Sequence, residues 1–336
     1  MHWLYIALII VASLFLLSLI LLWAAFLLTT RIFSRRQDKQ PDFHYFEASD
    51  FPNMTVTRVE LVNAKNKKLR GYIYEPKEGE VNQEEMIIFF SGVGMGHKAY
   101  TRQIVDLASE NNLRVLGMDY QGCDESEGRS TRGFYRTLYD AADIIRYVEE
   151  NYKGVKIHLI GHSWGGFLSG NVLSIYESTQ VETITILAAP NSLPDVFLGV
   201  TGSSVIKKLF LWLFAYISFG KLANIKTVKS IANNKVKTLV IHGREDQVVT
   251  YPRSGRLYIN TASEHKHIRP LIFDNKGHLV YLDTHAEMAQ NNLMKEYHAY
   301  KKDRDKQLEF ISNVDWSEVT NSDETVLAVI KDLLGM

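Results

Sequence analysis

The sequence predicts an α/β fold, with a mostly parallel central sheet covered by helices on both faces and a membrane-spanning helix before it. Three observations support this prediction. Short apolar runs alternate with amphipathic segments from residue 85 onward. One apolar run ends in a glycine-rich turn at residues 161–166 and leads directly into the next amphipathic segment. The first 30 residues are almost entirely apolar.

The composition bounds the class of protein. The 336 residues are 46% hydrophobic and 23% charged, which suits one large globular domain with an accessory segment. The formal net charge is +0, so the chain lacks the basic bias of nucleic-acid-binding domains and we expect no nucleic-acid partner. Cys123 is the single cysteine, which excludes a disulfide framework and a cysteine-rich metal site.

The N-terminal segment is predicted to be a membrane anchor at residues 1–30. Residues 3–30 contain no charged side chain, and a transmembrane helix needs about 20 apolar residues. A secretory signal peptide is the alternative, but no basic region precedes the apolar stretch and no A-x-A cleavage site follows it. Four basic residues follow the segment, so the positive-inside rule predicts a single-pass protein with its large domain in the cytoplasm. They are Arg31, Arg35, Arg36 and Lys39.

The elements of the folded domain follow in order. Residues 31–53 are polar and mixed, and we expect a juxtamembrane linker there, followed by the domain at 54–336. Alternation of apolar and polar residues predicts an antiparallel hairpin at 55–63 and 68–76. Later strands are predicted where the apolar runs are short and nearly continuous, which indicates burial on both faces and parallel pairing. These runs are 86–90, 113–120, 156–161, 183–190, 237–243 and 269–274.

Helical periodicity separates most of these strands. Residues 101–112 and 140–152 carry apolar side chains at the spacing of an amphipathic helix. Residues from about 190 to 235 depart from the strand pattern, so we expect a helical cap after the sixth strand.

The turn at 161–166 has the spacing of a nucleophile elbow. Gly161 and Gly165 lie two positions either side of Ser163, where side chains would collide in a sharp strand-to-helix turn. Such a turn exposes a serine hydroxyl above the sheet. A glycine-rich turn with an incidental serine is the alternative, and the surrounding sequence must decide between them.

A serine nucleophile needs a base and a third group that orients the base. Asp246 follows the strand at 237–243, and His278 ends the loop after the strand at 269–274. The order Ser163, Asp246, His278 is the order of an α/β-hydrolase triad. Glu245 and Asp195 are alternatives for the acid, because one adjoins Asp246 and the other follows an earlier strand.

An acyl-transfer site also needs donors for the oxyanion of its tetrahedral intermediate. The backbone N–H of Trp164, directly after the nucleophile, is the first expected donor. The second is the N–H of Val93, in the glycine-rich loop after the strand at 86–90, where Gly92 lets the backbone approach a bound carbonyl. This loop lacks the Lys-Ser or Lys-Thr pair of a phosphate-binding loop.

Four motifs together resemble the α/β-hydrolase superfamily over roughly residues 54–335. They are "GHSWGG", "HGREDQVV", "NKGHLVY" and "MDYQGCDESEG". Within the superfamily, the chain resembles the branch of monoacylglycerol lipases, lysophospholipases and serine aminopeptidases. It departs from many relatives at Ser91, where they have histidine, and at Gln121 and Asp124, where they have arginine and glycine. The departures leave the three triad positions in place.

The cap suggests the kind of substrate. Residues 209–219 are almost wholly apolar but too short to span a bilayer. A helix packed on the core is one interpretation. An acyl-chain pocket with Leu209, Trp212 and Phe214 in its wall is another, and the helix would then also dip into the membrane.

We therefore expect a membrane-anchored serine hydrolase of lipid-like esters, such as monoacylglycerols or lysophospholipids. An aminopeptidase-type peptidase is an alternative, although the cap is poor in the acidic groups that would hold a substrate amine. A non-catalytic binding module of the same fold is a further alternative. No metal and no organic cofactor is implied, because a triad and two N–H groups suffice for the reaction.

Overall fold

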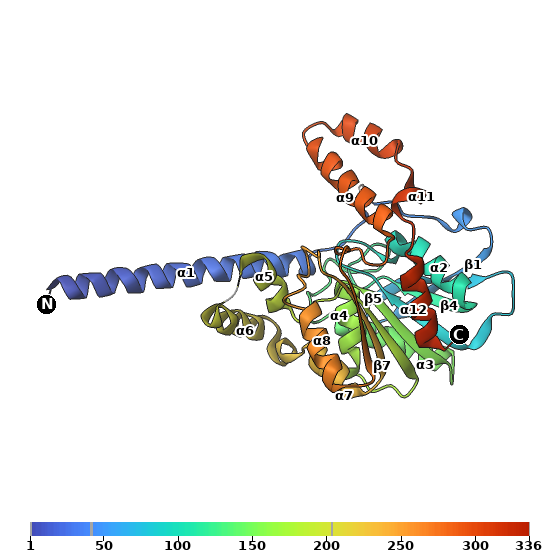
Figure 1. The fold of residues 1–336 in the computed structure, drawn as a ribbon, viewed down its shortest axis with the longest axis horizontal. Helices are drawn as coiled ribbons and strands as arrows, with labels where there is room; N and C mark the ends of the chain where they lie inside the picture. Colours follow the sequence, from blue (N-terminus) through green and yellow to red (C-terminus); the bar gives the residue numbers. More distant parts are fainter. Residues whose placement is uncertain (1, 41–42, 203, 336) are drawn as a thin grey trace.

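A computed structural model describes residues 2–40, 43–202 and 204–335, and its centre is one eight-stranded sheet (Figure 1). The strand order is β1-β2-β4-β3-β5-β6-β7-β8. The β1–β2 and β2–β4 pairs are antiparallel and all other neighbours are parallel, which confirms the predicted hairpin and the mostly parallel sheet. The strands are β1 Met54–Val62, β2 Lys68–Pro76, β3 Asn82–Phe90, β4 Leu113–Met118, β5 Lys156–His162, β6 Val181–Leu187, β7 Lys237–Gly243 and β8 Ile268–Phe273.

Both faces of the sheet are buried, as the consecutive apolar runs predicted. In β3, Ile88 and Phe90 belong to the core on one face, whereas Ile87 and Phe89 belong to the core on the other. The first face is covered by α3 Leu138–Asn151, α4 Trp164–Asn171, α7 Thr227–Asn234 and α8 Gly255–Glu264. The second face is covered by α2 Thr101–Asn111 and α12 Glu324–Leu334.

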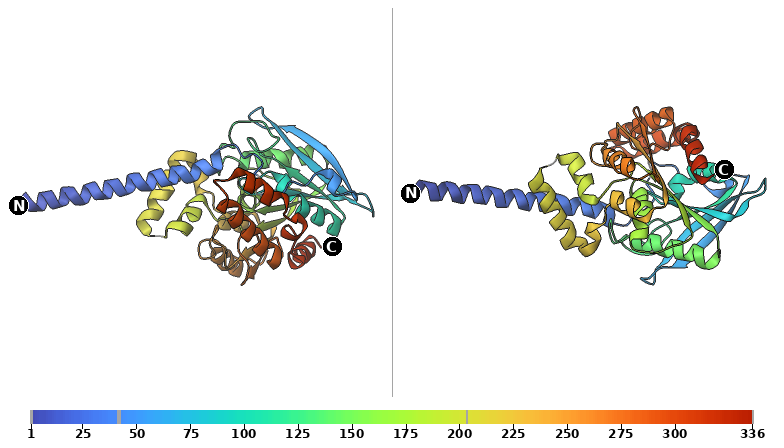
Figure 2. Two further views of the ribbon diagram at one scale, coloured as in Figure 1. Left: turned by 90° about the horizontal axis from the view of Figure 1, so that it is seen from above. Right: turned by 60° about the horizontal axis from the view of Figure 1, so that its bottom comes forward.

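The remaining helices lie outside these two layers. Three of them, α9 Thr284–Ala299, α10 Arg304–Ser312 and α11 Trp316–Val319, pack together and project from one end of the sheet (Figure 1). Between β6 and β7, where a cap was predicted, α5 Leu193–Thr201 and α6 Val205–Phe219 precede α7. Figure 2 shows α5 and α6 beside the C-terminal half of the N-terminal helix, and α6 contacts that helix directly.

The N-terminal helix, α1 His2–Ser34, is one continuous helix of 33 residues. At 1.5 Å per residue it is about 50 Å long, and it is long and apolar enough to cross a membrane. Its first half is exposed, whereas Phe26, Thr30 and Phe33 are buried near its C-terminal end. The helix ends at Ser34, four residues beyond the expected boundary at residue 30, because its last turn buries Phe33 against the domain.

The first part of the expected linker at 31–53 is packed on the domain. Isolated β-bridges pair Arg35 with Ser130 and Gln37 with Cys123. A single 3-10 turn, Ala48–Asp50, follows before β1 begins. Composition indicated a polar connection here. The two β-bridges join residues that lie about 90 positions apart in the sequence, so no local pattern could reveal them.

Candidate active site

The turn between β5 and α4 is a strained elbow with Ser163 at its tip. Ser163 has φ 55° and ψ −118°, a backbone conformation that few residues other than glycine adopt. Its N–H donates to the carbonyl of Leu187 at 2.8 Å, which ties the tip to β6. A Cβ at Gly165 would lie 1.9 Å from the carbonyl oxygen of Phe90, and one at Gly161 would lie 2.3 Å from that of Gly165. The two glycines are therefore required for the turn.

Three side chains from the carboxyl ends of three parallel strands meet at this elbow. His278, from the loop after β8, places Nε2 3.0 Å from Ser163 Oγ. Its Nδ1 lies 2.8 Å from Oδ2 of Asp246, from the loop after β7. The structure thus brings Ser163, His278 and Asp246 together. The alternative acid Asp195 instead accepts hydrogen bonds within the cap, from Ser192 Oγ at 2.6 Å and Asn191 Nδ2 at 2.8 Å.

Asp246 is held as a carboxylate. Burial alone would raise its pKa, but attraction to His278 and the hydrogen bonds that it accepts outweigh burial, so its pKa is lowered. Its second oxygen accepts the N–H groups of Val248 at 2.8 Å and Val249 at 2.7 Å. Because an ionised carboxylate can only accept, His278 donates through Nδ1–H and leaves Nε2 free to accept the Ser163 proton.

Two buried charged residues that sequence reasoning missed support the His278 loop. The carboxylate of Glu287, from α9, accepts the N–H groups on both sides of the histidine, Gly277 at 3.0 Å and Leu279 at 2.9 Å. Lys276 is 2% exposed, and its Nζ donates to Asp323 at 2.6 Å and to the carbonyl of Leu282. The motif "NKGHLVY" contains Lys276, but its charged partner Asp323 lies 47 residues away, before α12, and leaves no signal in a single sequence.

The two expected oxyanion donors have free N–H groups. Within the described parts of the chain, neither the Val93 N–H nor the Trp164 N–H has an acceptor. Gly92 lies beside the nucleophile, because a Cβ on it would be 3.5 Å from Ser163 Cβ. Its own N–H is occupied, donating to Tyr100 Oη at 3.2 Å. This contact excludes the Gly92 N–H as an oxyanion donor and leaves that of Val93, the next residue, as a free donor.

A buried hydrogen-bonded chain connects this loop to the base. Tyr100 Oη lies 2.8 Å from Nδ1 of His162, and Nε2 of His162 lies 2.9 Å from the carbonyl oxygen of His278. Since a carbonyl can only accept, His162 donates through Nε2–H and accepts the Tyr100 hydroxyl proton at Nδ1. The motif "GHSWGG" contains His162, but its role depends on contacts that the motif does not specify.

His162 should make the protein sensitive to acid. Burial, assisted by repulsion from His278, lowers its pKa to about 3, whereas an unfolded histidine titrates near about 6.5. As the pH falls below 6.5, His162 becomes protonated in the unfolded state but stays neutral in the folded state. Stability is therefore full above that pH and falls below it, by about 2 kcal/mol between pH 7 and pH 5.

Denaturant unfolding at the two pH values measures this effect, with His162→Gln as the comparison. The loss of unfolding free energy on acidification should be about 2 kcal/mol smaller in the variant, which cannot titrate at this position. Equal losses in the two proteins would contradict the prediction.

The three predicted cap residues lie on α6. Leu209 is 60% exposed, and Trp212 donates through Nε1 to Asn224 at 2.9 Å. Phe214 is buried against α1, with its ring centroid 4.5 Å from that of Trp23 and 6.0 Å from that of Phe26. Their role in substrate binding stays a prediction. A cleft of about 330 Å³ that includes Asp246 and Leu198 lies beside the triad, at the base of the cap.

No group of three or more histidine, cysteine or acidic side chains is arranged to hold a metal ion within the described ranges. The reactive groups at this site are the Ser163–His278–Asp246 series and the two backbone N–H groups. With His278 as base and Asp246 as its partner, the arrangement can activate a serine hydroxyl and stabilise an oxyanion.

Comparisons with known proteins agree with this fold. A family model described as alpha/beta hydrolase fold matches residues 85–224. A protein of Escherichia coli O157:H7 named "Uncharacterized protein YfhR" is 21% identical over 237 residues, covering 70% of this chain and 78% of that protein.

Among solved structures, the Pyrococcus furiosus esterase Pf2001 is similar, with a TM-score of 0.57 and 18% identity, covering 79% of this chain and 97% of that one. An acetyl xylan esterase from Paenibacillus sp. R4 has a TM-score of 0.54 and 13% identity, with 82% and 93% covered. At these identities the likeness establishes the fold, and the branch expected from the motifs stays a prediction. The family match, the sheet and the structural neighbours together show that the chain has the α/β-hydrolase fold.

Proposed function

We propose that the protein is a membrane-anchored serine hydrolase that cleaves carboxylic esters, with lipid-like esters as its substrates. The observation that carries the proposal is the hydrogen-bonded series of Ser163, His278 and Asp246, beside two free backbone N–H groups. The esterases that share the fold support the choice of an ester over another acyl substrate.

The geometry supports an acyl-enzyme reaction. Ser163 Oγ attacks the ester carbonyl carbon while its proton passes to Nε2 of His278. The negative oxygen that forms accepts hydrogen bonds from the N–H groups of Val93 and Trp164. Collapse breaks the ester C–O bond, and the departing alcohol takes the proton from His278. A water molecule then repeats the sequence at the acyl-serine and releases the carboxylic acid.

Contacts between the cap and the anchor support a membrane location for the substrate. Besides the contact of Phe214 with Trp23, the rings of Phe210 and Phe15 lie 6.4 Å apart, so α6 runs beside the middle of α1. An apolar groove of about 320 Å³ lies between the two helices. Its lining residues are Leu19, Ile20, Trp23, Phe210, Leu213, Phe214 and Ile217.

The outer surface of α6 is also apolar. An exposed apolar surface of this kind, continuous with a membrane-spanning helix, is best covered by lipid. We therefore place α6 at the membrane boundary, where acyl chains reach the cap directly. The exposed residues are Val205, Ile206, Leu209, Trp212, Leu213, Tyr216 and Ile217. The basic residues after α1 favour the cytoplasmic side for the domain.

The serine chemistry is tested by treating the full-length protein, in detergent and in lipid vesicles, with a fluorophosphonate probe. Wild type should be labelled and the Ser163→Ala variant should not. A well-folded wild type that stays unlabelled in both media would overturn the serine-hydrolase proposal.

The substrate class is tested on the same samples with esters from acetate to palmitate. The value of kcat/KM in vesicles should rise with chain length, and Leu209→Ser should lower it several-fold for the long esters alone. Leu308→Ser is the matched control, because Leu308 is 52% exposed on α10, away from α1. A preference for acetate, unchanged in Leu209→Ser, would contradict a lipid-like substrate while leaving the serine chemistry intact.

A further inference from the structure

The last residue of α1 and the six residues after it form a strap, residues 34–40, across the catalytic domain. The N–H of Gln37 donates to the carbonyl of Gly122 at 2.8 Å, and the N–H of Asp124 donates to the carbonyl of Gln37 at 2.8 Å. The Arg36 guanidinium donates to three carbonyls of the same loop, including that of Gly128 at 2.7 Å. Gln37 is 3% exposed. The strap is thus fixed to the loop at residues 121–128.

The end of the strap contacts the oxyanion loop, residues 91–97. The side-chain Nε2 of Gln40 donates to the carbonyl of Gly94, where φ is +89°. On the other side of Val93, the N–H of Gly92 donates to Tyr100. The expected oxyanion donor therefore lies between two fixed points, one provided by the core and one by the strap. Without such fixed points, a loop rich in glycine would sample many backbone conformations.

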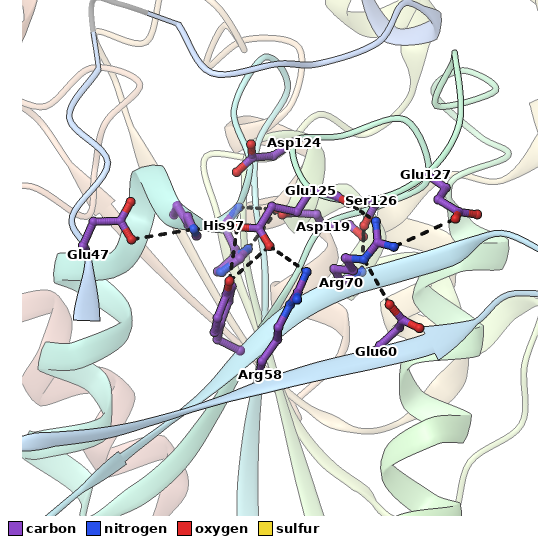
Figure 3. A network of polar contacts seen from close by, with 12 residues as sticks. Glu47, Arg58, Glu60, Arg70, His97, Asp119, Asp124, Glu125, Ser126 and Glu127 are labelled. Carbon is purple, nitrogen blue, oxygen red and sulfur yellow. Dashed lines mark hydrogen bonds and ion pairs between the residues drawn. The ribbon is translucent and has the colours of Figure 1, made fainter. Parts of the chain in front are cut away.

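The two loops that the strap contacts are also linked through residues at their ends. Figure 3 shows His97, at the end of the oxyanion loop, beside Asp119, which accepts both its N–H at 2.8 Å and its Nδ1 proton at 2.9 Å. Next to His97, Lys98 pairs with Glu125 at 2.6 Å. Because this network fixes the far end of the oxyanion loop, the Gln40 contact constrains the remaining part, next to Val93.

The same N-terminal segment supports the second oxyanion donor. Phe33, in the last turn of α1, is 8% exposed and places its ring centroid 5.5 Å from that of Trp164 and 4.9 Å from that of Phe134. The carbonyl of Phe33 also accepts a hydrogen bond from the hydroxyl of Thr131. Residues 33–40 thus contact both halves of the expected oxyanion hole, Gln40 behind Val93 and Phe33 against Trp164.

We propose that Gln40 is a positioning residue for the oxyanion hole, and that the strap couples the anchor helix to the geometry of the catalytic site. This inference rests on the proposed serine-hydrolase function. Gln40 acts on the reaction through the Gly94 carbonyl and the Val93 N–H. Its loss should weaken binding of the anionic tetrahedral state far more than binding of the neutral ester.

The test compares full-length wild type, Gln40→Glu and Gln40→Ala in detergent. The glutamate variant keeps the size of the side chain and replaces its donor by a carboxylate that repels the Gly94 carbonyl. Lys39→Gln is the matched control, because Lys39 belongs to the same strap and its contacts are with Glu47 and Tyr45 at the surface. Each protein is assayed for kcat and KM with one ester and for inhibition by a trifluoromethyl ketone.

The ketone reports on the oxyanion hole directly. Ser163 Oγ adds to its carbonyl carbon, the proton moves to His278, and the carbonyl oxygen becomes the anion that the two N–H groups bind. For both Gln40 variants we expect kcat to fall about 10- to 100-fold, part of the loss for a removed oxyanion donor, with KM within twofold of wild type. Affinity for the ketone should fall by the same factor as kcat/KM. Lys39→Gln should match wild type.

Several outcomes would overturn the proposal. Gln40 variants with wild-type kcat and ketone affinity would do so. A fall in kcat with unchanged ketone affinity would do so too, because the oxyanion hole would then be unaffected. A fall in kcat matched by a loss of folded protein would do so as well, because it would indicate a purely structural role. A wild type that reacts with neither a fluorophosphonate nor the ketone would instead overturn the serine-hydrolase function itself.

Discussion

Ester hydrolysis should fall on the order of 10⁵- to 10⁶-fold in kcat when either Ser163 or His278 is replaced by alanine. Ser163 Oγ and His278 Nε2 lie 3.0 Å apart, within hydrogen-bond reach, so nucleophile and base act as one unit. Removing the serine leaves no atom to form the acyl-enzyme. Removing the histidine leaves a neutral hydroxyl, which attacks an ester slowly at neutral pH.

Because the two groups act together, their losses should not add. The double variant Ser163→Ala/His278→Ala should be as active as either single variant, within about threefold, and the residual rate should come from the oxyanion hole and substrate binding. Steady-state kinetics on the three purified variants measures this, with circular dichroism to confirm that each is folded. A double variant that is a further 10³-fold slower would show that the two residues act independently.

Asp246→Asn should lower kcat on the order of 10⁴-fold. The lowered pKa of Asp246 keeps it ionised near neutral pH, and the carboxylate holds the proton of His278 on Nδ1. Asparagine can present its N–H₂ group to Nδ1 and so favour the tautomer whose proton points at Ser163. The base is then unable to accept the serine proton.

The fold should survive this substitution, because the asparagine carbonyl oxygen can still accept the N–H groups of Val248 and Val249. Asp195→Asn is the control, since Asp195 interacts with Ser192 and Asn191 in the cap. Its kcat should stay within about threefold of wild type. The assignment of the acid would be wrong if Asp195→Asn were the slower enzyme.

Local sequence patterns were sufficient to predict the sheet and the elbow that carries Ser163. Consecutive apolar residues, as at 86–90 in β3, indicate a strand buried on both faces, and each expected strand is present. The glycines around Ser163 predicted a sharp turn. In the structure a Cβ on Gly165 would collide with the backbone of Phe90, and one on Gly161 with that of Gly165. Both signals depend on neighbours within a few residues, which a single sequence contains.

The choice of acid and the support of the base required the tertiary structure. Glu245, Asp246 and Asp195 all lie near the ends of strands, and the loop conformations decide which carboxylate reaches His278. Glu287 and Lys276 support the His278 loop through contacts with main-chain groups and with α12, which carry no residue pattern. Such contacts depend on the tertiary packing of helices that are distant in the sequence.

The sequence by itself determined the α/β-hydrolase fold, the position of Ser163 in a glycine elbow, the order of the triad and the apolar character of α1. The tertiary structure decided that residues 34–40 are a strap rather than a free linker and that Phe214 packs on α1. It also decided that Tyr100 and Gln40 hold the loop around Val93 from opposite sides. The physical reason is range: strand, helix and turn preferences act between near neighbours, whereas Gln40 and Gly94 meet across 54 residues of chain.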